Sequence, residues 1–216
     1  MKPVCLFLLI IGMILPVYAQ TGLPEHRFVS GNWIVDGQRL YQKDVRAPLA
    51  KANIHAPQSG PMIYEFNVRY ETGVEDGHGG FGLHVFADKA YDGPSWGSGK
   101  SYLLWLNYDE TPVSGSGIPS GLSAQVYRSL GNSYMTLEES VDLNDYLSLV
   151  GDDPSIQVPV KLWVNGETGE IRVYDPTDET LSSYYYFFVN SRDIPLQGAW
   201  TALRTNGISL SFGLGL

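Results

Sequence analysis

The sequence predicts an all-β fold, a sandwich of two antiparallel sheets, on three observations. Apolar and polar residues alternate with a period of two along most of the chain, and helical periodicity is nearly absent. Roughly a dozen short alternating stretches are separated by turns rich in glycine, proline and serine. Because each such strand has one apolar face to bury, the strands are expected to stack as two sheets around a shared core.

The first nineteen residues have the pattern of a secretory signal. Lys2 gives a positive start, Val4–Leu15 is apolar but too short to span a bilayer, and Pro16–Ala19 ends in a small-residue cleavage site. We therefore expect residues 1–19 to be a signal peptide and residues 20–216 to form one β-sandwich domain. An uncleaved N-terminal anchor is the alternative.

The composition limits the cellular compartment and the binding partners that we expect. Beyond residue 19 there is no cysteine and no Asn-x-Ser/Thr acceptor, which together indicate bacterial export, to the periplasm or the cell exterior. The full chain carries 14 Lys+Arg against 23 Asp+Glu, and an acidic surface repels a phosphate backbone. Nucleic acid is therefore not an expected partner, and no basic run suggests binding to an anionic membrane.

Strands follow one another along the chain. In Met62–Tyr70 the even positions are large and apolar, and Glu65, Asn67 and Arg69 share the opposite face, which predicts a strand with one wet face. Val158–Asp175 predicts a hairpin, because two alternating runs flank Asn165–Gly169, whose glycines supply the positive φ of a tight turn. The same alternation predicts strands at Phe81–Asp88, Tyr102–Tyr108, Gly121–Ser129 and Ile208–Leu214.

One short helix and two long loops complete the prediction. Asp142 can cap a helix over Asp142–Val150, and Gly151–Pro154 ends it. Asp92–Gly99 and Pro112–Gly121 are rich in glycine, proline and serine, and we expect them to connect strands of one domain.

These patterns resemble the concanavalin A-like lectin and glucanase superfamily, including its laminin-G-like members. The resemblance implies a jelly-roll sandwich and covers most of residues 30–216. It rests on strands and turns at Asn32–Gly37, Pro61–Arg69, Gly79–Phe86, Lys161–Gly166 and Gly207–Phe212.

The catalytic motif of the sugar-active enzymes in that superfamily is absent. Those enzymes often carry Glu-x-Asp-x-x-Glu on a central strand, with alternate carboxylates as nucleophile and acid. The strand Tyr102–Tyr108 offers Leu103, Trp105 and Asn107 on the corresponding side, and these cannot act in that way. We expect no catalytic residues. A hydrolase or lyase with an atypical site is the alternative, with acids from Asp88, Asp92, Asp109 or Glu110.

A set of aromatic and amide residues remains as the candidate ligand-binding face. A sugar ring stacks on an aromatic side chain while neighbouring amides take its hydroxyls. Trp105, beside Asn107, is the first candidate, although packing in the core would explain any one of these residues as well. The full set predicted to lie outside the core is His84, Phe86, Trp105, Asn107, Gln125, Tyr127, Lys161 and Trp163.

The loop Asp88–Gly97 is a second candidate. Tyr91 and Trp96 could contact a ligand there, and Asp88 and Asp92 are weak candidates for a Ca²⁺ site that needs six to eight oxygens. A solvated loop with Trp96 packed over the sandwich edge explains the same residues. No other cofactor is expected.

Tyr184–Val189 is bulky on both faces, which is typical of a fully covered strand or of an edge that contacts a partner. Tyr184, Tyr185, Tyr186, Phe187 and Phe188 form that candidate contact surface. The sequence thus favours an exported, non-catalytic module that binds a glycan or another surface polymer. A structural or assembly protein of the bacterial envelope, or of an extracellular appendage, is the main alternative.

Overall fold

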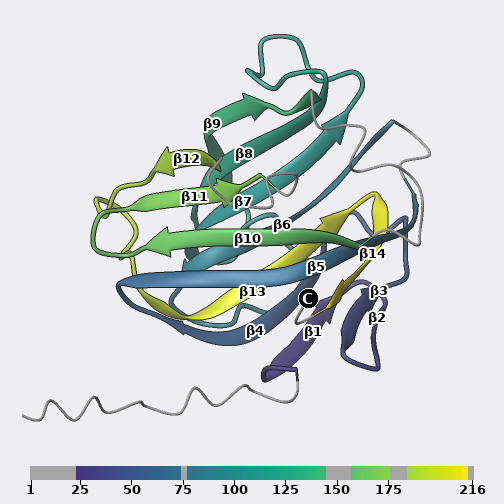
Figure 1. Ribbon diagram of the computed structural model, residues 1–216, viewed down its shortest axis with the longest axis horizontal. Helices are drawn as coiled ribbons and strands as arrows, with labels where there is room; N and C mark the ends of the chain where they lie inside the picture. The colour runs from purple at the N-terminus through teal and green to yellow at the C-terminus, as the bar shows by residue number, and fades with distance from the viewer. Residues whose placement is uncertain (1–22, 74–76, 145–156, 176–183, 214–216) are drawn as a thin grey trace, which may run out of the picture.

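In the computed structural model, residues 23–73, 77–144, 157–175 and 184–213 are described, and within them two seven-stranded antiparallel sheets stack face to face (Figure 1). Sheet A has the order β1 (His26–Ser30), β4 (Ala50–Gln58), β13 (Gly198–Asn206), β6 (His78–Ala87), β7 (Lys100–Asp109), β8 (Gly121–Leu130) and β9 (Met135–Asp142). Sheet B has the order β12 (Tyr184–Phe188), β11 (Glu170–Tyr174), β10 (Gln157–Asn165), β5 (Pro61–Gly73), β14 (Ile208–Gly213), β3 (Arg39–Gln42) and β2 (Trp33–Asp36).

The predicted antiparallel sandwich is confirmed. β6 to β9 form a meander of sequential neighbours, whereas β13 and β14 return from the far end of the chain and pair inside sheet A and sheet B respectively. The predicted loops lie between β6 and β7 and between β7 and β8. Within the described residues no helix is long and apolar enough to cross a membrane.

The predicted hairpin is also confirmed, as β10 and β11. Leu162 pairs with Val173 and Val164 with Ile171. The turn closes through a 2.8 Å hydrogen bond from the Gly169 amide to the Asn165 carbonyl, and Gly169 has the positive φ, +77°. Gly166 is needed for space, because a Cβ there would lie 2.2 Å from the Leu196 carbonyl oxygen.

Two sequence predictions lie mostly outside the described residues. The signal peptide, residues 1–19, is one. The helix predicted over Asp142–Val150 is the other. Asp142 itself ends β9, and its carboxylate accepts a 2.9 Å hydrogen bond from the Asn144 amide. That bond closes a local turn of the kind aspartate favours.

The core lies between the two sheets, where the apolar sides of alternating strands meet. Phe212 of β14 is buried near its centre, and three aromatic rings surround it. The ring centroids of Phe81, Trp33 and Phe66 lie 5.7, 6.1 and 6.3 Å from that of Phe212. These distances favour edge and tilted contacts, which add to the stabilisation from buried area.

Phe86 breaks the alternation of β6. Period two places it with His84 on the side away from the core, but it is buried within the core cluster. Its own φ of +61° accounts for this, because a left-handed residue does not direct its side chain as an extended strand residue does. The Gln58 side chain supports this conformation by accepting a 2.7 Å hydrogen bond from the Phe86 amide.

Phe212→Ala is expected to lower the free energy of unfolding by about 3–5 kcal/mol, because it removes a buried ring that contacts both sheets. Urea unfolding followed by tryptophan fluorescence measures the loss. Phe188→Ala is the matched control, since Phe188 is 64% exposed and its removal should change stability by less than about 0.5 kcal/mol. Equal effects of the two substitutions would contradict this core.

Candidate functional site

The two tryptophans predicted to share a binding face lie on opposite outer surfaces of the sandwich. In β7, Leu104 and Leu106 face the core, so Trp105 points away from sheet B. In β10, Leu162 and Val164 face the core, so Trp163 points away from sheet A. The prediction that Trp105, Asn107 and Trp163 form one face is therefore wrong.

Trp105 lies against the outer face of sheet A. It pairs across the sheet with Gly82 on one side and Gln125 on the other. Its ring rests on two glycines of β6, because a Cβ added to Gly80 or Gly82 would come within 2.8 Å of a ring carbon. Only 9% of Trp105 is exposed, so the ring is not available as an open stacking platform.

The polar neighbours of Trp105 satisfy one another. The Trp105 indole N–H donates to Asn107 Oδ1 at 3.0 Å. The Gln125 amide donates to Ser123 Oγ at 2.8 Å, and the Tyr127 hydroxyl donates to Gln125 Oε1 at 2.6 Å. The sequence thus identified four residues that share a face, Trp105, Asn107, Gln125 and Tyr127. Their side chains form hydrogen bonds with neighbours on the same strand.

His84 is fully buried, so its predicted place on an open face is wrong. Its Nδ1 lies 2.9 Å from Ser101 Oγ. Burial holds the pKa of His84 well below its usual value, and the positive charges of Arg204 and Lys51 act in the same direction. The imidazole is therefore neutral at pH 7.

The loop between β6 and β7 covers this part of sheet A. Asn53 donates to the Tyr91 carbonyl at 2.9 Å, and Lys51 donates to Ser95 Oγ at 2.9 Å. The Tyr91 ring packs on Gly99, where a Cβ would lie 1.9 Å from a ring carbon. Trp96 remains 49% exposed. The loop is therefore anchored to the sheet, and Trp96 is its outward aromatic residue.

The two aspartates of this loop have other partners. Asp92 forms an ion pair with Arg27, and the Tyr91 hydroxyl lies 3.4 Å from Asp88 Oδ1. Across the described ranges no group of three His, Cys, Asp or Glu side chains is placed to hold a metal ion. The suggestion of a Ca²⁺ site at Asp88 and Asp92 gains no support from this geometry.

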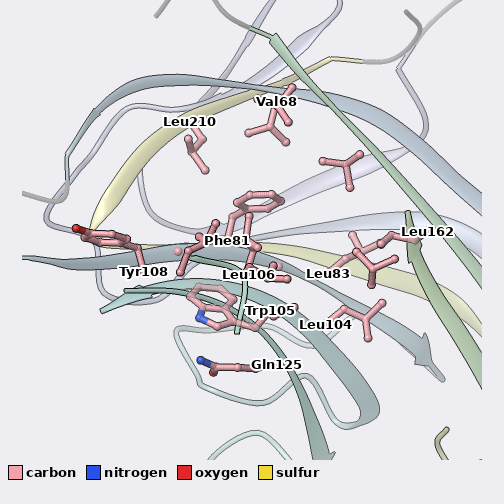
Figure 2. A pocket seen from close by; sticks show the side chains of 18 of the residues that line it. Val68, Phe81, Leu83, Leu104, Trp105, Leu106, Tyr108, Gln125, Leu162 and Leu210 are labelled. Carbon is pink, nitrogen blue, oxygen red and sulfur yellow. The ribbon is translucent and has the colours of Figure 1, made fainter. Parts of the chain in front are cut away.

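A cavity of about 550 Å³ lies between the sheets. Figure 2 shows Val68 and Leu210 of sheet B across from Phe81 and Leu106 of sheet A. Strands β7 and β8 form one wall of the cavity, so Trp105 and Gln125 border it as well, although their side chains lie on the outer side of that wall. Because its lining is predominantly apolar, the cavity does not offer the hydrogen bonds that sugar hydroxyls need once they leave water.

The outer face of sheet B carries a row of aromatic and apolar side chains with one arginine among them. Register places Tyr186, Arg172, Trp163 and Ile63 directly side by side on four adjacent strands, β12, β11, β10 and β5. The Arg172 guanidinium lies 4.4 Å from the centre of the Trp163 ring. We call this row, together with Phe188, the aromatic face.

The aromatic face is open to solvent at the two ends of the row, and Arg172 and Trp163 between them are half-buried. Tyr186 is 58% and Ile63 is 54% exposed. The rings of Tyr186 and Phe188 meet edge to face with centroids 5.7 Å apart. Charged groups flank the row: the Lys161 ammonium lies 5.7 Å from the Tyr174 ring centre and 4.0 Å from Glu65. Such an exposed apolar row, with polar margins, is typical of a binding surface.

The aromatic face clarifies the pattern at 184–188. Phe187 is buried, Tyr185 packs against the core, and Tyr186 and Phe188 point outward, so the strand is covered on one face only. The side chain of Tyr184 lies outside the description. Sequence analysis did not assign Ile63 and Arg172 to any site. Both residues pair with Trp163 across the sheet, and only the strand order reveals that pairing.

Solved structures with a similar fold include a carbohydrate-binding module and two lectin domains. Module CBM66 from Bacillus subtilis has a TM-score of 0.54 and 14% identity, covering 88% of this chain and 93% of the module. The chain has a concanavalin A-like jelly-roll fold. The resemblance seen in the sequence is thereby confirmed at the level of fold.

The two lectin structures match similarly. A legume lectin-like domain from Entamoeba histolytica has a TM-score of 0.53 and 12% identity, covering 87% of this chain and 85% of that domain. Peanut lectin has a TM-score of 0.54 and 13% identity, covering 89% of this chain and 92% of the lectin. No protein-family model matches the sequence, and no curated protein matches it.

Ala124→Leu is expected to raise the free energy of unfolding by about 1 kcal/mol, because Ala124 lines the cavity and the larger side chain has space to fill. Ala52→Leu is the control, since Ala52 is fully buried outside the cavity lining and the same enlargement should cost about 1–3 kcal/mol. Urea unfolding measures both. Equal destabilisation by the two substitutions would show that the cavity is not present in solution.

Proposed function

We propose that this protein is an exported, non-catalytic module that binds a glycan through the aromatic face of sheet B. The observation that carries the proposal is the lateral row of Tyr186, Arg172, Trp163 and Ile63 on adjacent strands, with its two ends exposed and its centre half-buried. Tyrosine and tryptophan rings present apolar surfaces to the C–H faces of sugars, while the flanking charged groups can take the hydroxyls.

Support for a glycan comes from fold and composition together. The similar structures include a carbohydrate-binding module and lectins, so the fold is one that hosts this function in other proteins. The chain lacks the Glu-x-Asp-x-x-Glu motif of the related enzymes, which supports a non-catalytic role. The signal pattern of residues 1–19 supports export, with residues 20–216 as the mature domain.

A protein contact at the same surface is the second candidate, because of the position of β12. β12 is an edge strand of sheet B in the described structure, and its outward residues Tyr186 and Phe188 are the most exposed of the aromatic face. An exposed edge strand with apolar side chains can pair with another chain. This would suit a structural or assembly protein of the envelope. Light scattering after size exclusion, with and without Tyr186→Lys, distinguishes self-association from a monomeric glycan binder.

Trp163→Ala is expected to weaken glycan binding at least about tenfold, because it removes the central ring of the aromatic face. A panel of soluble and insoluble bacterial and plant polysaccharides, screened by pull-down and followed by calorimetry, provides the measurement. Fold integrity is checked by urea unfolding of the same variant.

Trp96→Ala is the matched control, an exposed tryptophan on the opposite side of the sandwich, and should leave affinity unchanged. Loss of binding in Trp96→Ala with retention in Trp163→Ala would move the site to the loop over sheet A. Retention in both would exclude the aromatic face.

A further inference from the structure

Three basic side chains gather on the outer face of sheet A, under the loop between β6 and β7. Arg204 of β13 pairs directly with Lys51 of β4. On the other side of β13, His84 of β6 pairs with Ala202, which is two residues from Arg204. Lys51, Arg204 and His84 are all essentially inaccessible to solvent. Like charges on directly opposed positions of a sheet repel each other, so this arrangement requires a compensating interaction.

The hydrogen-bond partners in this cluster carry no negative charge. Lys51 donates to Ser95 Oγ, and the Arg204 guanidinium donates to the Trp96 carbonyl. His84 Nδ1 contacts Ser101 Oγ, whose hydroxyl in turn donates to the Ser98 carbonyl at 3.1 Å. Neutral oxygens satisfy some of the donors, but they do not neutralise two buried positive charges.

Three polar atoms of the cluster have no hydrogen-bond partner. They are Arg204 Nε, Ser98 Oγ and His84 Nε2, each buried, although the Trp96 backbone favours the protonated form of His84. A buried guanidinium N–H without an acceptor costs free energy, and such orphaned groups commonly mark the place of a bound ion or water. A hydroxyl and a guanidinium N–H both donate to an anion, and His84 adds a third donor when it is protonated.

One carboxylate acts on Lys51 of this cluster, and it already has another partner. Asp92 favours the charged form of Lys51, but its side chain is exposed and pairs with Arg27. Burial lowers the pKa of Lys51 to about 8, with a further contribution from Arg204, and burial lowers the pKa of Arg204 to about 10. Burial is the largest cause of both shifts, so removal from water disfavours the charged forms of Lys51 and Arg204.

We propose that Lys51, Arg204 and Ser98 form a binding site for an oxyanion, a carboxylate, sulfate or phosphate group, enclosed by the loop of residues 88–99. An oxyanion accepts several hydrogen bonds at once and matches the fork of the Arg204 guanidinium. It neutralises the buried charges and stabilises protonated His84. The group is either a free ion or the acidic substituent of a sugar. The site lies on the opposite side of the sandwich from the aromatic face, so it does not depend on the function proposed above.

The test measures urea unfolding at pH 7 and constant ionic strength, with graded phosphate, sulfate or glucuronate replacing chloride. The wild-type midpoint is expected to rise and to saturate, because an ion that binds only the folded state stabilises it in proportion to its occupancy. Saturation with phosphate or sulfate alone supports a free-ion site. Saturation with glucuronate supports an acidic sugar. A rise that never saturates, or no rise, overturns the proposal.

Lys51→Met separates binding from a structural role. It is expected to abolish the saturable rise and, without oxyanion, to unfold at the same or a higher urea concentration than wild type, because it removes an unneutralised buried charge. Lys43→Met is the control at an exposed lysine and should keep the full response. Wild-type behaviour of Lys51→Met in oxyanion would overturn the site.

Ser98→Ala provides a second variant should Lys51→Met fail to fold. It deletes an unpartnered buried hydroxyl, so its stability without oxyanion should equal that of wild type or exceed it. Its half-saturating oxyanion concentration is expected to rise at least threefold. An unchanged half-saturating concentration would exclude Ser98 from the site, and with it the proposed geometry.

Discussion

The constraint on which this molecule depends is the period-two geometry of its strands. Each strand gives one face to the shared core, so every residue between two core residues points away from the opposite sheet. Leu104 and Leu106 thereby fix the direction of Trp105, and Leu162 and Val164 fix that of Trp163. The packing of the core therefore determines which polar and aromatic side chains can act together, and it divides them between two surfaces that cannot cooperate on one small ligand.

Those two surfaces have opposite characters. The outer face of sheet A is covered by its own loop and by self-satisfied amides and hydroxyls, and positive charge is buried beneath it. The outer face of sheet B is open and aromatic, with charges at its margins. The chain is acidic, with 23 Asp+Glu and 14 Lys+Arg, yet two of these basic residues, Lys51 and Arg204, are buried. Lysine and arginine are almost never fully buried unless they are paired.

Alternation in the sequence was sufficient to predict β5 to β8, the hairpin of β10 and β11, and β14, but not β4, β9 or β13. It also predicted which residues share a face within the meander, as Trp105, Asn107, Gln125 and Tyr127 do. It could not predict strand order, because the pairing of β10 with β5 involves residues about a hundred positions apart in the chain. The separation of Trp163 from Trp105 was hidden for that reason. The burial of His84 and Lys51 was hidden too, since alternation does not reveal whether a loop covers the outer face. Phe86 departs from the alternation because of its positive φ, and the pattern of side chains does not predict a backbone angle.

The placement of β13 and β14 bears on how the chain reaches its native state. β13 lies between β4 and β6, and β14 lies between β5 and β3, so the last strands of the chain occupy interior positions in both sheets. Neither sheet can be continuous until these residues have been synthesised and have docked. The long loops that must close before β13 and β14 pair cost conformational entropy, so folding is expected to be slow compared with that of a meander of the same size. Until then, the partly built sheets present unpaired strand edges, which are able to pair with other chains.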